Sequence, residues 1–351
     1  MKKRNDFLKM VVVLFFVFLT GCASVQTGLY HDPDGDIDST HNIGYKPSFS
    51  YNTLIAGIRM SGYKKNYTGD AQTIITQTQR YNRGLRQLPP NAFYSRFNVT
   101  ETKVNDHPYF LISPKQNARS DKVVVFVYGG GFLLGIDFMH WNAIERIINE
   151  LSVPVCVPLY PIYPETNLPA AISFIDEVFA QLHEAYPDAR IIGMGDSSGS
   201  CLLLSYCRYL TTAEEPRFPD RLILVSPAQV AGIDEEIQIQ MRAISKNDPG
   251  ISFDIVNSFP VIFNLSDDDD DNWFYRPLEG DFSLYPPIYV FAGTVDIFYP
   301  LVQPFVERVR LQGKTIELYT GYGMMHDWPY MPIASESRYA LGIILEIIDR
   351  E

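Results

Sequence analysis

Short apolar segments alternate with amphipathic helical segments from residue 122 to residue 350 of this 351-residue chain. The apolar segments are rich in Val, Ile and Leu, as expected for strands that are buried on both faces. Strands separated by helices specify a mostly parallel sheet that is covered by helices on both sides. The predicted strands are 122–128, 153–160, 189–196, 221–227, 286–293 and 314–321, and the predicted helices are 141–152, 168–186, 199–210, 300–313 and 335–350.

Two further strands are predicted before this alternation begins. The segment FNVTETKVN alternates like an exposed strand, and HPYFLISP reads as its antiparallel partner at one edge, which makes eight strands in total. The alternation breaks once, at about 231–281, where the helical segment AGIDEEIQIQMRAISK and then FDIVNSFPVIFNL precede the acidic run Asp267–Asp271. Five adjacent acids repel one another and predict a solvated loop rather than a metal site. Together with helical sequence at about 51–90, the insertion is predicted to form a cap, within one domain that spans residues 51–351.

The N-terminus has the pattern of a signal peptide. A basic segment, MKKRNDFLK, precedes the apolar segment MVVVLFFVFL, which is short for a membrane span. Leu19-Thr20-Gly21-Cys22 follows and resembles the bacterial lipobox. We therefore expect residues 1–21 to be removed, Cys22 to be lipidated, and residues 22–50 to tether the domain to the cell envelope, outside the cytoplasm. The alternative is a plain anchor or uncleaved signal in which Cys22 is incidental.

Charge and cysteine content exclude several classes of function. The formal net charge is −12 and the pI is about 5.0, which argues against nucleic acid as a partner. Besides Cys22, three cysteines remain, Cys156, Cys201 and Cys207, and this odd number implies no disulfide framework. We interpret them as small buried residues. No Cys and His cluster has the spacing of zinc ligands, so no metal is expected.

The sequence Gly195-Asp196-Ser197-Ser198-Gly199 lies between a predicted strand and a predicted helix. This is G-x-S-x-G in the strand–turn–helix context that presents a nucleophilic serine. The register selects Ser197 as the nucleophile, and Ser198 contributes its backbone N–H. The alternative, a glycine-rich turn without chemistry, remains open at this stage.

A serine hydroxyl needs a base, and the base needs an acid. Among six histidines, His326 alone follows the last predicted strand on a loop. Asp296 directly follows the preceding strand and precedes a helix, so the chain order is Ser197, Asp296, His326. Asp327, Glu279 and Asp281 are the rival acids. Asp327 is the weaker choice, since a sequence neighbour rarely reaches the far ring nitrogen.

These motifs together resemble the α/β-hydrolases of the hormone-sensitive-lipase-like esterase family. The matching segments occur in order as YGGGF, PLYPIYPE, GDSSG, RPLEGDF, AGTVD and MMHDW. The resemblance implies an α/β-hydrolase fold and an oxyanion hole made by the N–H groups of Gly130, Gly131 and Ser198. It also implies that Asp196 steadies the turn at the nucleophile. Tyr128 stands where the family has a histidine, and a phenol could still anchor the loop.

The predicted function is a serine carboxylesterase that cleaves small esters without a metal or organic cofactor. YGGGF fits neither a phosphate loop nor a dinucleotide fingerprint, because both need glycines at other spacings. Two alternatives are a catalytically silent binding protein on the same fold and an amide or peptide hydrolase.

Overall fold

The computed structural model describes residues 40–351, apart from residues 44–45, 86, 166, 266–269 and 332. The predicted signal peptide, Cys22, the tether up to residue 39 and most of the acidic run 267–271 therefore lie outside the described residues. No helix in the described part is both long and apolar enough to cross a membrane.

A mixed sheet of nine strands forms the centre of the described chain, in the order β1-β9-β8-β7-β6-β4-β5-β3-β2. The mostly parallel sheet is confirmed, because all neighbours from β1 to β5 in this order pair in parallel. The predicted antiparallel pair, β2 and β3, lies at one edge. The strands are β1 (Thr40–Ile43), β2 (Phe97–Val104), β3 (His107–Pro114), β4 (Lys122–Val127), β5 (Val155–Pro158), β6 (Arg190–Asp196), β7 (Arg221–Val225), β8 (Ile288–Gly293) and β9 (Ile316–Gly321).

The N-terminal strand β1 corrects two expectations. It pairs in parallel with β9, Thr40 opposite Leu318 and Ile43 opposite Gly321, and makes nine strands where eight were predicted. The predicted tether, 22–50, is therefore wrong in its last part, which holds β1 and the start of helix α2 (Phe49–Ser61). A strand of four residues, THNI, is too short to show a period in the sequence.

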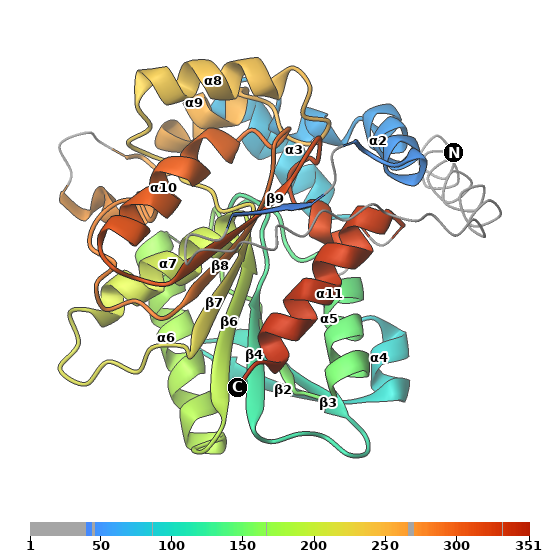
Figure 1. Ribbon diagram of the computed structural model, residues 1–351, viewed down its shortest axis with the longest axis vertical. Helices are drawn as coiled ribbons and strands as arrows, with labels where there is room; N and C mark the ends of the chain where they lie inside the picture. Colours follow the sequence, from blue (N-terminus) through green and yellow to red (C-terminus); the bar gives the residue numbers. More distant parts are fainter. Residues whose placement is uncertain (1–39, 44–45, 86, 166, 266–269, 332) are drawn as a thin grey trace.

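Helices cover both faces of the sheet (Figure 1). Helices α5 (Phe138–Leu151) and α11 (Ser335–Asp349) pack together on one face, while α6 (Leu168–Ala185), α7 (Ser198–Leu210) and α10 (Tyr299–Leu311) lie on the other. The short helix α4 (Asn91–Arg96) packs on β2. Every residue of β4, β7 and β8 is buried, which explains their continuous apolar sequence. The cysteines Cys156, Cys201 and Cys207 are buried and free, as predicted.

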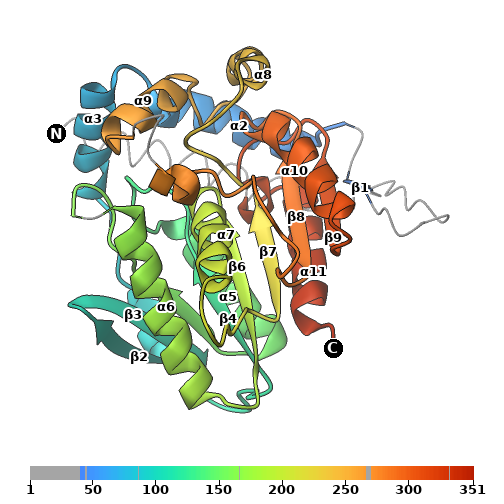
Figure 2. The ribbon, with the colours of Figure 1, turned by 90° about the vertical axis from the view of Figure 1, so that its left-hand side faces the viewer.

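Two distant parts of the chain lie together above the carboxyl ends of the parallel strands (Figure 2). The first part contains α2, the 3₁₀ helix η1 (Tyr63–Tyr67) and α3 (Ala71–Asn82), and the second contains α8 (Glu235–Ser245) and α9 (Asp254–Ile262). Helices α3 and α9 pack against each other. We call these two parts the cap. Of two further 3₁₀ helices, η2 (Asp270–Tyr275) lies near the end of the insertion and η3 (Trp328–Tyr330) follows β9.

Candidate active site

The turn between β6 and α7 holds Ser197 in a strained conformation. Its φ of 48° and ψ of −118° lie in a region that residues with a side chain rarely adopt. A Cβ on Gly195 would lie 2.8 Å from the carbonyl carbon of Gly199, and a Cβ on Gly199 would lie 2.0 Å from the oxygen of Val127, so both positions require glycine. The N–H of Ser197 donates to the oxygen of Val225 at 2.9 Å. This is the sharp strand-to-helix turn of a nucleophile elbow.

The glycine triplet after β4 lies directly against this turn. A Cβ on Gly129 would be 2.2 Å from Oδ2 of Asp196 and 2.9 Å from Cβ of Ser197. Gly130 and Gly131 take φ values of 137° and 64°, which a side chain would strain. Close approach and conformation thus both demand glycine, and the backbone of the triplet runs beside the candidate nucleophile.

A contact between Ser198 and the glycine loop joins the segments that carry the expected oxyanion donors. The N–H of Phe132, which follows the triplet, donates to Oγ of Ser198 at 3.3 Å. Ser198 is the first residue of α7, so its own N–H has no acceptor within the helix. The cap covers this loop, since a Cβ on Gly131 would meet the ring of Phe259 at 3.2 Å.

Asp196 ties the glycine loop to a histidine that the sequence did not single out. Its Oδ2 accepts the N–H of Gly129 at 3.0 Å and lies 3.1 Å from Nε2 of His140. The other ring nitrogen of His140 lies 2.9 Å from Oδ1 of Asp137. The spacing Asp137-x-x-His140 at a helix start was the available signal, but only the tertiary structure brings Asp196 to it.

The two carboxylates keep His140 protonated. Burial lowers the pKa of His140, but Asp196 and Asp137 outweigh this effect and raise the pKa well above 6.5. In turn, the charge of His140 outweighs burial at Asp137 and holds its pKa low. The backbone N–H of Asp137 also lies 3.1 Å from Nδ1 of His140, but a protonated nitrogen donates to the carboxylate instead of accepting. His140 thus links Asp137 to Asp196 in the interior, next to the turn at Ser197.

Tyr128 anchors the end of β4 to the loop after β5. Its hydroxyl donates to the oxygen of Tyr160 at 3.3 Å, and the hydroxyl of Tyr160 donates to the oxygen of Tyr128 at 2.7 Å. The two rings stack with centroids 4.6 Å apart. This reciprocal pair fits the anchoring role that was expected for Tyr128.

His326 and Asp296 meet in a buried pair. Nδ1 of His326 lies 2.9 Å from Oδ1 of Asp296, and the two residues are 5% and 1% exposed. The same Oδ1 accepts the N–H of Phe298 at 2.9 Å, which fixes the carboxylate. The acid selected from the sequence thus lies at the ring nitrogen that an orienting acid must hold.

The rival acids lie elsewhere. Oδ2 of Asp327 is 3.3 Å from Nε2 of His326, so Asp327 lies at the opposite ring nitrogen from Asp296 and does not hold Nδ1. Glu279 accepts a hydrogen bond from Gln229, and Asp281 accepts the N–H of Ser283.

The serine and histidine loops attach to consecutive residues at the end of β7. The N–H of Ser197 binds Val225, and the N–H of Asp327 donates to Oγ of Ser226 at 2.9 Å. The N–H of Ser226 donates in turn to the oxygen of Phe291 in β8 at 2.7 Å. The carboxyl edge of the sheet therefore brings both loops to one place.

Buried carboxylates surround the imidazole of His326. Burial lowers the pKa of His326, but Asp296, Asp327 and Asp248 outweigh it and raise the pKa above 6.5. Burial also raises the pKa of Asp327 well above its ordinary value, and the neighbouring Asp196 and Asp296 raise it further. Oδ2 of Asp327 and Nε2 of His326, 3.3 Å apart, are thus close enough to share a proton.

Comparison with known proteins agrees with this geometry. A family model described as alpha/beta hydrolase fold matches residues 124–330, more than half of the chain. The chain belongs to this α/β-hydrolase family. The match spans the glycine triplet, the elbow and the loops of Asp296 and His326.

The chain is similar to a curated lipase and, in fold, to solved structures described as esterases. It is 26% identical over 213 residues to a triacylglycerol lipase of Mycobacterium tuberculosis (strain ATCC 25618 / H37Rv), a match that covers 58% of this chain and only 41% of the lipase. A Staphylococcus aureus structure assigned as an esterase has a TM-score of 0.71 at 24% identity, covering 83% of this chain and 97% of that one. An esterase from the bacterial hormone-sensitive lipase family has a TM-score of 0.69 at 21% identity, covering 86% and 98%. At these identities the two structures establish the fold.

Proposed function

We propose that this α/β-hydrolase is a carboxylic ester hydrolase that works through an acyl-enzyme on Ser197. The observation that carries the proposal is the buried pair of His326 and Asp296, 2.9 Å apart, on loops that adjoin the strained turn at Ser197. Its similarity to a triacylglycerol lipase and to structures described as esterases favours an ester as the substrate bond.

In the first half-reaction, Oγ of Ser197 attacks the carbonyl carbon of the ester, and its proton passes to Nε2 of His326. Asp296 stabilises the imidazolium that forms. The N–H groups of Gly130, Gly131 and Ser198 donate to the oxyanion, each contributing about 10²–10³ in rate. His326 then protonates the leaving alkoxide oxygen as the bond to the acyl carbon breaks.

In the second half-reaction, water attacks the acyl-enzyme and gives its proton to Nε2 of His326. The tetrahedral intermediate collapses, the carboxylic acid leaves, and the proton returns to Oγ of Ser197. These steps need no metal or organic cofactor. Asp327 has to yield Nε2 to the hydroxyl of Ser197 when substrate binds, since catalytic hydrogen bonds tighten in the substrate complex.

Fluorophosphonate labelling tests the nucleophile. We expect a fluorophosphonate probe to modify Ser197, located by mass spectrometry of the digested protein, because only an activated serine reacts. An unlabelled protein would favour a silent binding protein on this fold. Since an amide hydrolase would also be labelled, matched p-nitrophenyl ester and p-nitroanilide substrates separate the two, and faster anilide cleavage would contradict the proposal.

We further propose that Cys22 is lipidated and tethers the enzyme to the cell envelope, facing outside the cytoplasm. The support is the sequence Leu19-Thr20-Gly21-Cys22 after a basic and then an apolar segment. One diacylated residue supplies the two chains that stable anchoring requires. Globomycin is expected to block maturation, seen as accumulation of the longer precursor, and processing that is unchanged under the drug would contradict the tether.

A further inference from the structure

Asp248, on the cap loop between α8 and α9, reaches the loop that carries Asp296. It is only 2% exposed. Its Oδ1 accepts the N–H groups of Gly250 and Ile251 at 2.8 and 3.0 Å, which fixes the carboxylate within its own loop. Its Oδ2 accepts the N–H of Ile297 at 3.1 Å, and Ile297 directly follows Asp296. A cap residue thus holds the peptide unit next to the acid of the catalytic pair.

Asp248 also interacts electrostatically with Asp296 and His326. Burial raises the pKa of Asp248, and the charge of Asp296 raises it further, to about 6, against the opposing effect of His326. In turn, the charge of Asp248 raises the pKa of His326, as those of Asp296 and Asp327 do. Three carboxylates from three different loops therefore act on one imidazole.

Both parts of the cap attach to this region. From the first part, Lys64 donates through Nζ to the backbone oxygen of Asp248 at 2.8 Å and also to the oxygen of Ser245. The hydroxyl of Tyr51 in α2 accepts the N–H of Met325, the residue before His326, at 2.6 Å. The cap therefore contacts the acid loop through Asp248 and the histidine loop through Tyr51.

We propose that Asp248 is a positioning residue for the reaction. It holds the peptide after Asp296 so that the Asp296 carboxylate faces Nδ1 of His326. Because Asp248 belongs to the cap, His326 is correctly oriented only when the cap is docked on the sheet. The inference rests on the proposed function, in which His326 is the base. A hydrogen bond from a neighbouring element fixes the orientation of a catalytic group, and a small misplacement there costs rate.

The replacement Asp248→Asn tests this role with little change in volume. The amide oxygen can still accept from Gly250 and Ile251, but the amide nitrogen then faces the N–H of Ile297, two donors without an acceptor. We expect kcat for a short p-nitrophenyl ester to fall by about tenfold or more with KM within about twofold. Because a negative charge near His326 is lost, its pKa falls, and the acid limb of the pH profile of kcat/KM moves to lower pH.

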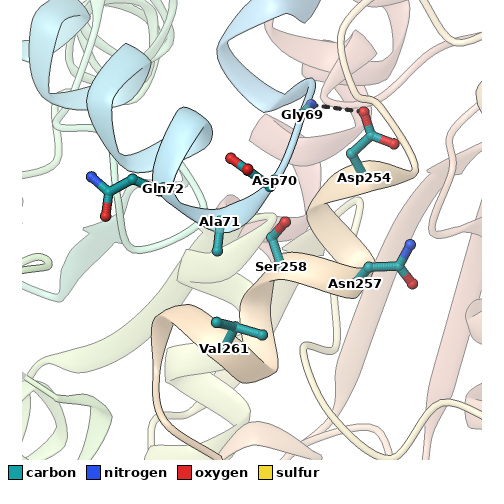
Figure 3. A pocket seen from close by; sticks show the side chains of 8 residues that line it. All are labelled: Gly69, Asp70, Ala71, Gln72, Asp254, Asn257, Ser258 and Val261. Carbon is teal, nitrogen blue, oxygen red and sulfur yellow. Dashed lines mark hydrogen bonds between the residues drawn. The ribbon is translucent and has the colours of Figure 1, made fainter.

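Asp254→Asn is the matched control. Asp254 is also a cap carboxylate that accepts one backbone N–H, from Gly69 at 2.8 Å. It faces a surface hollow of about 540 Å³ between α3 and α9, lined by Gly69, Asp70, Ala71, Gln72, Asp254, Asn257, Ser258 and Val261 (Figure 3). We expect this variant to keep the wild-type kcat and acid limb.

The shift of the acid limb separates positioning from a general loss of structure. If Asp248 only stabilised the fold, the Asp248→Asn variant would have a lower melting temperature and a smaller fraction of active enzyme. The midpoint of the acid limb of its kcat/KM profile would then stay unchanged. A folded Asp248→Asn variant with wild-type kcat and an unmoved limb would overturn the inference. If that variant does not fold, Asp248→Glu keeps the charge but displaces it. We expect a lower kcat per fluorophosphonate-labelled Ser197 at the wild-type melting temperature, and a wild-type kcat per labelled site would overturn the inference. Fluorophosphonate labelling of Ser197 in the wild type shows separately whether the proposed function holds.

Discussion

Replacing Ser197 with alanine is expected to lower kcat for a short p-nitrophenyl ester by about 10⁴–10⁶-fold. The replacement removes the atom that forms the acyl-enzyme, while the donors around the oxyanion remain and supply the residual rate. Because Ser197 is held at a φ of 48°, alanine inherits the same strain and the fold is expected to persist. The measurement is steady-state hydrolysis by the purified variant, with circular dichroism as the check on folding.

Ser205→Ala is the matched control for this variant. Ser205 lies on the same helix, α7, and its hydroxyl donates to the oxygen of Phe274 at 2.7 Å, away from the turn. Losing this bond is expected to cost about 1 kcal/mol of stability but to leave kcat unchanged. If the Ser197→Ala variant kept a rate near that of the wild type, the acyl-enzyme mechanism on Ser197 would be wrong.

Replacing Gly199 with alanine is expected to destabilise the protein by about 3 kcal/mol or more, or to prevent folding. The added Cβ would lie 2.0 Å from the oxygen of Val127, 2.7 Å from the carbonyl carbon of Val127 and 2.8 Å from the oxygen of Tyr128. All three are backbone atoms at the end of β4, so no side-chain rotation relieves the collision. Relief requires moving α7 away from the sheet, which also moves Ser197. Urea unfolding followed by tryptophan fluorescence measures the effect.

Gly342→Ala is the control, because it adds the same methyl group at a position where no collision occurs. Gly342 lies within α11, and a Cβ there would meet nothing within 4 Å. Alanine is the better helix former, so a gain of about 0.5–1 kcal/mol is expected. A Gly199→Ala variant as stable as the wild type would mean that the turn relaxes without cost, contrary to the fit described above.

The candidate nucleophile, base and acid could be selected from the sequence because each follows a predicted strand. In a parallel sheet, the carboxyl ends of the strands meet at one edge, so Ser197, Asp296 and His326 were expected to converge. The role of the glycine triplet as an oxyanion hole came instead from the resemblance to the esterase family. The strand β1 was missed, because Thr40–Ile43 is held by its pairing with β9 and has no pattern of its own.

The contacts of three residues could not be predicted from the local sequence: those of His140, Asp327 and Asp248. His140 reads as the start of a helix, and its contact with Asp196 spans 56 residues. Asp327 was weighed as a rival for Nδ1 of His326, but its carboxylate lies 3.3 Å from Nε2 instead. Asp248 lies in a cap segment without strand or motif, 49 residues from its partner Ile297.

The sequence by itself determined the fold class, the elbow at Ser197 and the order of the three catalytic candidates. These features depend on local sequence patterns: the periodicity of apolar residues in strands and helices, and the glycines that a tight turn requires. Only the tertiary structure decided which carboxylates surround His326, that His140 contacts the glycine loop through Asp196, and that the cap contacts the loops of both Asp296 and His326. Contacts of this kind depend on how separate elements pack, and neither periodicity nor spacing along the chain encodes the distance between two side chains on different loops.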